Sequence, residues 1–171
     1  MKKSFILTCF VIFVSLSPSV LNGQTIESLD KAFAGAVTEI ASKVQGRAEI
    51  AIVGIESPLS EVSIFLADEL SSYLVLSGRF IVLERSTYLE VVNAEHQFQM
   101  SGLVSDESAV GIGHYLGAKV VITGSLQRST GFTQLRLRVL DVRTAQLLTM
   151  YTARIRSDDP LLASIMSPLD N

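Results

Sequence analysis

A short, near-continuous apolar run, Glu49–Ile55, is the feature that most constrains how this chain can fold. Its sequence, Glu-Ile-Ala-Ile-Val-Gly-Ile, is rich in β-branched residues and bounded by polar ones, which predicts a buried strand. Helical patterns lie on both sides of it in the chain. Thr25–Val44 carries apolar residues at every third or fourth position, and a second helix is expected to start at Ser57–Pro58 and end at Ser77–Gly78.

The order of the remaining elements indicates the type of sheet. A second strand is expected at Phe80–Leu83, followed by a helix from Thr87 to Phe98 and another that begins after Ser105 and stops at Gly117. Three further strands close the chain, at Lys119–Leu126, Thr133–Val142 and Leu147–Ile155. Strands separated by helices favour parallel pairing, whereas the final hairpins must be antiparallel. We therefore expect an α/β fold, a mixed β-sheet of about five strands whose C-terminal three form an antiparallel meander, flanked by about four helices.

The start of the chain has the three parts of a secretory signal peptide. Lys2 and Lys3 precede an apolar run, Phe5–Val14, and a turn-forming stretch that ends at Gly23. The run is shorter than the roughly 20 residues of a membrane-spanning helix, although a retained anchor is the alternative. We expect 1–23 to be a signal peptide, 24–156 one α/β domain with its N-terminal helix, and 157–171 a loop tail with one short helical turn.

Export would also change the chemistry and the charge of the chain. Cys9, the only cysteine, lies inside the apolar run, where it is either removed with the signal or lipidated. Removal would leave the mature protein without thiols or disulfides. Loss of Lys2 and Lys3 changes the formal net charge from −3 to −5, so nothing attracts nucleic acid electrostatically.

The histidines and the glycine-rich stretch do not form a metal or nucleotide site. His96 and His114 have no second ligand at a metal-binding spacing, so both are expected to face solvent from helices. Gly111, Gly113 and Gly117 lie within a predicted helix rather than between a strand and a helix, unlike a dinucleotide-binding loop. Close packing of that helix on the sheet explains these glycines.

Candidate nucleophiles and paired carboxylates also have ordinary structural explanations. Ser101 and Ser125 are not part of a Gly-x-Ser-x-Gly turn that would expose an activated serine. Asp106–Glu107 fits the first turn of a helix, and Asp158–Asp159 fits a solvated tail. We predict no catalytic residues, no cofactor and no metal, and hence a protein that is not an enzyme. A hydrolase with a dispersed site is the alternative.

Several segments together resemble the CsgG/HfaB family of curli-secretion proteins. They are Arg79–Arg85, Phe98–Val104, Leu116–Ser125 and Leu135–Thr144, and the match extends over about Ala48–Ala153. The family includes curli export channels, holdfast-anchoring proteins and the related lipoprotein activators of penicillin-binding proteins (LpoB). The resemblance implies a non-catalytic periplasmic α/β domain that binds other envelope proteins and is associated with the outer membrane.

The chain departs from the channel-forming members of that family. Only a tight turn separates Leu126 from Thr133, where a channel inserts membrane-crossing strands of about 9 to 11 residues each. The mature chain is thus expected to have no membrane-spanning segment. We predict a role in assembly or transport at the outer membrane through protein–protein binding, with a homo-oligomer as one form of association. The alternative is an LpoB-like activator of a penicillin-binding protein.

One loop between two predicted helices is the candidate contact with such partners. It mixes an aromatic residue, amides and a glycine, as a recognition loop can. Its residues are Phe98, Gln99, Met100, Ser101, Gly102, Leu103 and Val104. The alternative is that its apolar members fill the core.

Overall fold

The computed structural model describes residues 25–83 and 105–166, with side chains as far as Ala163. These residues form a six-stranded mixed sheet in the order β1-β6-β5-β4-β2-β3. The strands are β1 (Ile26–Glu27), β2 (Glu49–Glu56), β3 (Ile81–Leu83), β4 (Val120–Ser129), β5 (Phe132–Asp141) and β6 (Leu147–Arg156). The helices are α1 (Leu29–Lys43), α2 (Ser60–Leu76), α4 (Asp106–Leu116) and α5 (Pro160–Met166).

The strand pairing confirms the expected fold class. β2 runs parallel to both β3 and β4, whereas β4, β5 and β6 form an antiparallel meander. The turn between β4 and β5 consists of Thr130 and Gly131, and Gly131 takes a positive φ of 84° there. The predicted helix from Thr87 to Phe98 and the signal peptide lie outside the described residues.

The sixth strand, β1, was not expected, because its residues were assigned to the first helix. The Ser28 hydroxyl accepts a hydrogen bond from the Lys31 N–H at 3.4 Å, so α1 begins after Ser28 and the preceding residues are extended. Ile26 is 50% exposed and pairs with β6 at the sheet edge. Tyr151 on β6 donates to the Glu27 carboxylate at 3.4 Å, and burial, together with that carboxylate, raises the pKa of Tyr151 to about 12.

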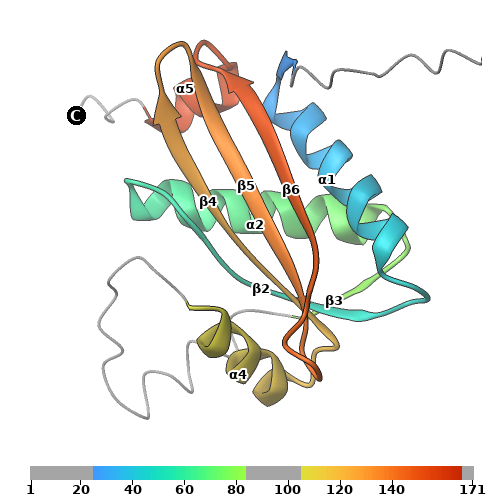
Figure 1. Cartoon of the computed structure of the whole chain (residues 1–171). Helices are drawn as coiled ribbons and strands as arrows, with labels where there is room; N and C mark the ends of the chain where they lie inside the picture. Colours follow the sequence, from blue (N-terminus) through green and yellow to red (C-terminus); the bar gives the residue numbers. More distant parts are fainter. Residues whose placement is uncertain (1–24, 84–104, 167–171) are drawn as a thin grey trace, which may run out of the picture.

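β2 separates two apolar cores, as expected for a buried strand. Ile50, Ile52 and Ile55 belong to the larger core, which contains the buried faces of α1 and α2. Ala51 and Val53 belong to a smaller core shared with α4. The sheet therefore has α1 and α2 on one face and α4 on the other (Figure 1).

The ends of the helices show which local signals were interpreted correctly. Ser105 caps α4 through its hydroxyl, which accepts from the Ser108 N–H at 3.2 Å, and Gly117 closes the helix with φ 72°. The expected start of α2 at Ser57 is wrong. The Ser57 hydroxyl instead bonds locally to the backbone of Leu59, and the helix begins at Ser60 without a side-chain cap.

The glycines of α4 differ in what surrounds them. A Cβ on Gly113 would lie 2.5 Å from Val121 Cγ1 and 2.7 Å from Val142 Cγ2, so this glycine does permit close packing on the sheet. Nothing lies within 4 Å of the corresponding position on Gly111. Close packing was therefore the wrong explanation for Gly111, and for Gly117, whose role is the left-handed helix end.

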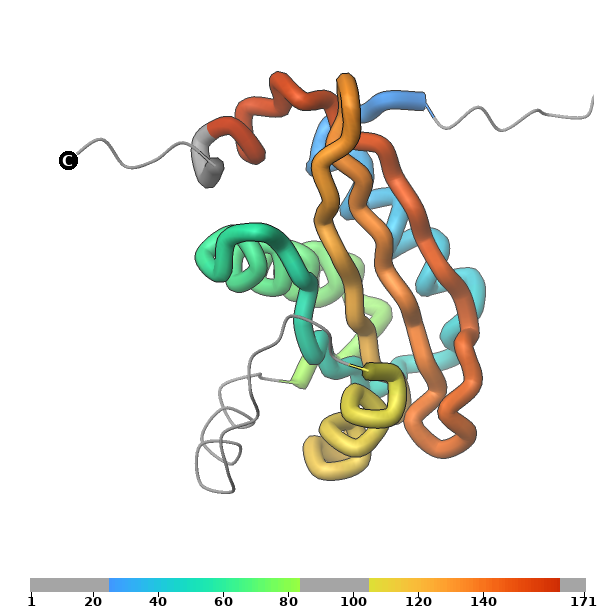
Figure 2. The backbone as a smooth tube through the Cα atoms, turned by 60° about the vertical axis from the view of Figure 1, so that its left-hand side comes forward, coloured from blue at the N-terminus to red at the C-terminus, as the bar shows by residue number. Residues whose placement is uncertain are grey.

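The buried carboxylate of Asp159 links the C-terminal segment to the start of α1 through hydrogen bonds. Asp159 is only 1% exposed, and its carboxylate accepts from the N–H groups of Leu29, Leu161 and Leu162 at 3.0, 3.1 and 3.2 Å. The interpretation of Asp158–Asp159 as a solvated tail is thus wrong for Asp159. These bonds hold α5 close to β1 and to the β4–β5 turn, at one end of the sheet (Figure 2).

Gly113→Ala is expected to destabilise the protein, because the added methyl group overlaps two valine side chains in a closed core. The expected loss is about 1–3 kcal/mol in the free energy of unfolding, measured by chemical denaturation. Gly111→Ala is the matched control, and it should be neutral or stabilising by up to about 1 kcal/mol, since its Cβ meets open space. Equal effects of the two substitutions would contradict this packing.

Asp159→Ala is expected to lower the free energy of unfolding by about 1–3 kcal/mol, because three backbone donors would lose their acceptor. Asp158→Ala removes the same charge from a side chain that is 86% exposed, and should change stability by less than about 0.5 kcal/mol. Urea denaturation of both variants measures the difference. A loss in Asp158→Ala as large as that in Asp159→Ala would show that charge, not capping, is responsible.

Candidate interaction surface

Within the described residues, helices cover one face of the C-terminal meander fully and the other face only in part. Leu135, Leu137 and Val139 on β5 are 0% exposed and point toward α1 and α2. The residues between them, Arg136 and Arg138, point to the opposite face. There α4 covers only the end of the meander where Val121 and Leu140 lie, and no other described helix packs on it (Figure 1).

The outward positions of this open face combine guanidinium groups with apolar side chains. We refer to it as the arginine face and define it by Phe132, Arg136, Arg138, Met150 and Arg154. Ser125, Gln127, Gln134 and Thr152 fill the neighbouring outward positions. None of these outward positions is an aspartate or a glutamate.

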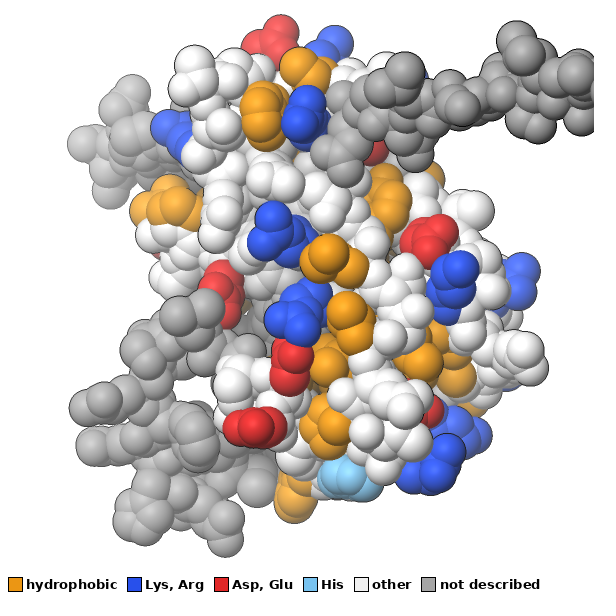
Figure 3. All heavy atoms as spheres, viewed as in Figure 1, with side chains coloured by type: hydrophobic (Ala, Val, Ile, Leu, Met, Phe, Trp, Pro, Cys, Tyr) orange, Lys and Arg blue, Asp and Glu red, His pale blue; other side chains and the backbone are white. Residues whose placement is uncertain are grey.

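Sheet register fixes the spacing of the arginine face. Arg136 lies directly between Ser125 on β4 and Thr152 on β6. Arg138 is opposite Met150, and Arg154 is opposite Gln134. Figure 3 shows Lys or Arg side chains beside hydrophobic ones over the meander, with acidic side chains nearby toward α4.

The guanidinium groups are held in two different ways. Arg154 lies over the Phe132 ring, with its Cζ 4.9 Å from the ring centroid, which is a cation–π contact. Arg138 Nη2 donates to Asp106 Oδ2 at 2.5 Å and so joins β5 to the first turn of α4. Its Nε is buried without a hydrogen-bond partner among the described residues. Within the same residues, no carboxylate lies within ion-pair distance of Arg136 or Arg154.

This composition suits binding to another macromolecule. Arginine, aromatic residues and methionine are enriched at protein interfaces, and Met150 is 53% exposed. A guanidinium pairs with carboxylates through two parallel hydrogen bonds. The arrangement therefore favours an acidic partner surface that also buries some apolar area.

The loop chosen from the sequence as the partner contact, Phe98–Val104, lies outside the described residues, as do His96 and the candidate nucleophile Ser101. His114 is exposed on α4. Ser125 belongs to the outward face of β4, next to Arg136. In the ranges 25–83 and 105–166, no three His, Cys, Asp or Glu side chains come together as a metal ion would require.

The sequence alone led to no role for Arg136 and Arg138, which alternate with leucines along β5. The missed signal was that arginines occupy alternate positions in two strands joined by a hairpin, since Arg154 and Arg156 recur two apart on β6. Antiparallel pairing places both sets on the same face. In the part of the chain that is described, no helix has the length and apolar character needed to cross a membrane.

Solved structures with a similar fold include LpoB domains and a lipoprotein. The C-terminal domain of LpoB from Salmonella enterica superposes with a TM-score of 0.64 at 14% identity, over 75% of this chain and 98% of that domain. The same domain from Escherichia coli gives 0.62 at 15% identity, with the same coverage. Lipoprotein GNA1162 from Neisseria meningitidis gives 0.52 at 17% identity, over 68% of this chain and 89% of that one. At these identities the similarity shows the fold alone.

Sequence comparison gives the family. No curated protein matches the sequence significantly. The profile of the curli production assembly/transport component CsgG matches residues 43–129, which is just over half of the chain. This range runs from the end of α1 to the end of β4 and includes the central strand β2. The chain therefore belongs to the CsgG family.

Proposed function

We propose that this protein is a non-catalytic periplasmic member of the CsgG family that binds other envelope proteins during assembly or transport at the outer membrane. The observation that carries the proposal is the arginine face, a sheet surface with exposed guanidinium and apolar groups that α4 contacts only at one end, through Asp106 and Arg138. Family membership supports the setting in the cell envelope.

The charge of the arginine face indicates the kind of partner. The chain as a whole is acidic, with a formal net charge of −3, yet this face presents only positive and neutral side chains. Such segregation favours approach of an acidic protein surface. Cation–π packing of Arg154 on Phe132 orders one of the guanidinium groups before binding.

A second candidate function is activation of a penicillin-binding protein during peptidoglycan synthesis. The observation that favours it is the LpoB-like fold, which extends over 98% of the LpoB C-terminal domain. Both candidates use a binding surface rather than a reacting centre. They differ in the partner, which is an export or assembly component in the first and a cell-wall synthase in the second.

Removing two guanidinium groups should weaken partner binding strongly. In the double variant Arg136→Gln and Arg154→Gln, we expect capture from envelope extract to fall at least about tenfold, because each charge-assisted hydrogen bond contributes about 1.5–3 kcal/mol. The matched control carries Arg47→Gln and Arg143→Gln, which remove the same charge from exposed loops. Quantitative mass spectrometry of the captured proteins measures the effect and identifies the partner class.

The result that would contradict the proposal is equal capture by the two double variants. Wild-type binding should also weaken as salt concentration rises, since exposed charges are screened over about 8 Å at physiological ionic strength. Enrichment of a penicillin-binding protein would favour the second candidate function over the first.

Export should remove residues 1–23 and leave a periplasmic chain without cysteine. We expect the intact mass of the protein from the periplasmic fraction to match a chain starting near residue 24, and a thiol reagent to find no reactive group, because Cys9 would be lost. A mass that retains the N-terminus, or one that includes acyl chains at Cys9, would contradict this prediction.

A further inference from the structure

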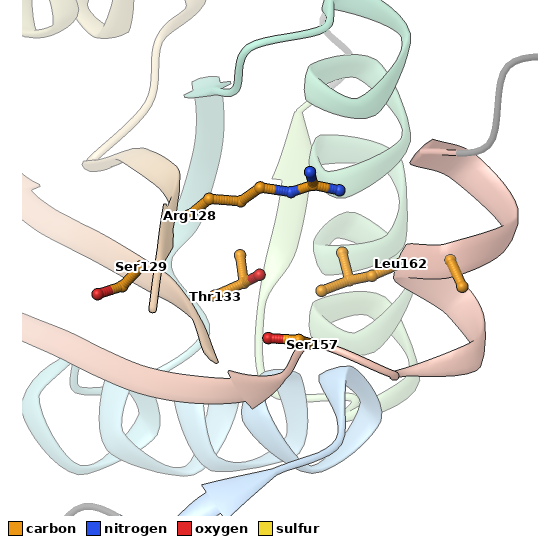
Figure 4. Close-up of a pocket in the computed structure, with 6 residues that line it drawn as sticks. Arg128, Ser129, Thr133, Ser157 and Leu162 are labelled. Atoms are coloured by element: carbon orange, nitrogen blue, oxygen red, sulfur yellow. The ribbon is translucent and has the colours of Figure 1, made fainter. Parts of the chain in front are cut away.

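A cavity of about 340 Å³ lies at the end of the sheet, between the β4–β5 hairpin and α5. It is on the helix-covered side of the meander, opposite to the arginine face. The lining side chains belong to two segments of the chain, 128–133 and 157–163, and Figure 4 draws them as sticks. They are Arg128, Ser129, Thr133, Ser157, Leu162 and Ala163.

The cavity occurs where the inward face of the meander changes from apolar to polar. Along β4 the inward residues are apolar as far as Leu126, and the next inward position is Arg128. On β5 the inward residue beyond Leu135 is Thr133, which is only 4% exposed. Arg128 and Thr133 are direct cross-strand partners, so the sheet itself sets their spacing.

The lining has one strong cation and several hydroxyl groups against an apolar wall. A guanidinium carries five N–H donors, and Arg128 also has contacts within the protein. Thr133 and Ser157 add hydroxyls that can donate. Among the residues whose side chains the structure describes, no carboxylate lines the cavity, and the carboxylate of the nearby Asp159 accepts from backbone N–H groups.

We propose that this cavity binds a carboxylate attached to a small apolar group, as at the C-terminal residue of a peptide. The guanidinium of Arg128 and the hydroxyls of Thr133 and Ser157 hold the carboxylate. Leu162 and Ala163 contact the apolar group. The volume is at the lower end of the roughly 300–1,000 Å³ of ligand sites, which suits one or two residues rather than a long chain.

Titration of the full mature chain, followed by NMR, tests the proposal with N-acetylalanine as the probe. N-acetylalanine amide, which has the same shape without the charge, should bind at least about tenfold more weakly. Equal binding of acid and amide, or no binding of the acid, would overturn the proposal. Propionate, which has a carboxylate but no peptide group, tests whether the cavity recognises more than a carboxylate. If propionate bound as tightly as N-acetylalanine, the proposal that the ligand is the C-terminal residue of a peptide would be overturned.

Variants locate the binding in this cavity. Arg128→Gln and Thr133→Val should each weaken N-acetylalanine binding by about tenfold or more. Arg47→Gln removes an exposed arginine at the opposite end of the sheet and should leave binding unchanged. Thermal unfolding confirms that each variant is folded. Unchanged binding by folded Arg128→Gln would overturn the proposal, whatever the outcome for the arginine face.

Discussion

Burial of β2 on both faces is the constraint on which the rest of the structure depends. Fully burying an isoleucine contributes about 1.5–3 kcal/mol, so Ile50, Ile52 and Ile55 need a helix layer above them. Ala51 and Val53 need a second layer below. The register shift between Ile52 and Gly54 places Ile55 on the same side as Ile52, which a regular strand of alternating side chains would not do.

The strands of the meander, unlike β2, are not buried along their whole length on both faces. The outward face of the meander is therefore partly open. α4 is 11 residues long and packs where β2, β4 and the end of β5 meet, so it protects Val121 and Leu140 and reaches no further. On the rest of the outward surface of β4–β6, polar and arginine side chains occupy most positions, together with the apolar Phe132 and Met150. Among the described residues, no helix covers this part of the meander, and under the proposed function it is the surface that a partner contacts.

Elements with strong local signals were predictable from the sequence. β2 has its apolar run, and α4 has a serine cap, acidic first turn and closing glycine, all within a few residues. What could not be predicted depends on contacts distant in sequence. β1 is fixed by pairing with β6, and Asp159 is buried because it bonds to Leu29, 130 residues away. The arginine face could be identified only from the register of two strands, whereas the composition of the loop Phe98–Val104 pointed to a contact there instead.

The central claim is that the arginine face docks onto an acidic partner, and arginine-specific chemical modification with phenylglyoxal tests it most directly. The reagent is applied to the protein alone and in its captured complex, and modified sites are quantified by mass spectrometry. The account predicts that Arg136 and Arg154 become protected in the complex while Arg47 and Arg143 stay reactive. Full reactivity of Arg136 and Arg154 in the complex would contradict it.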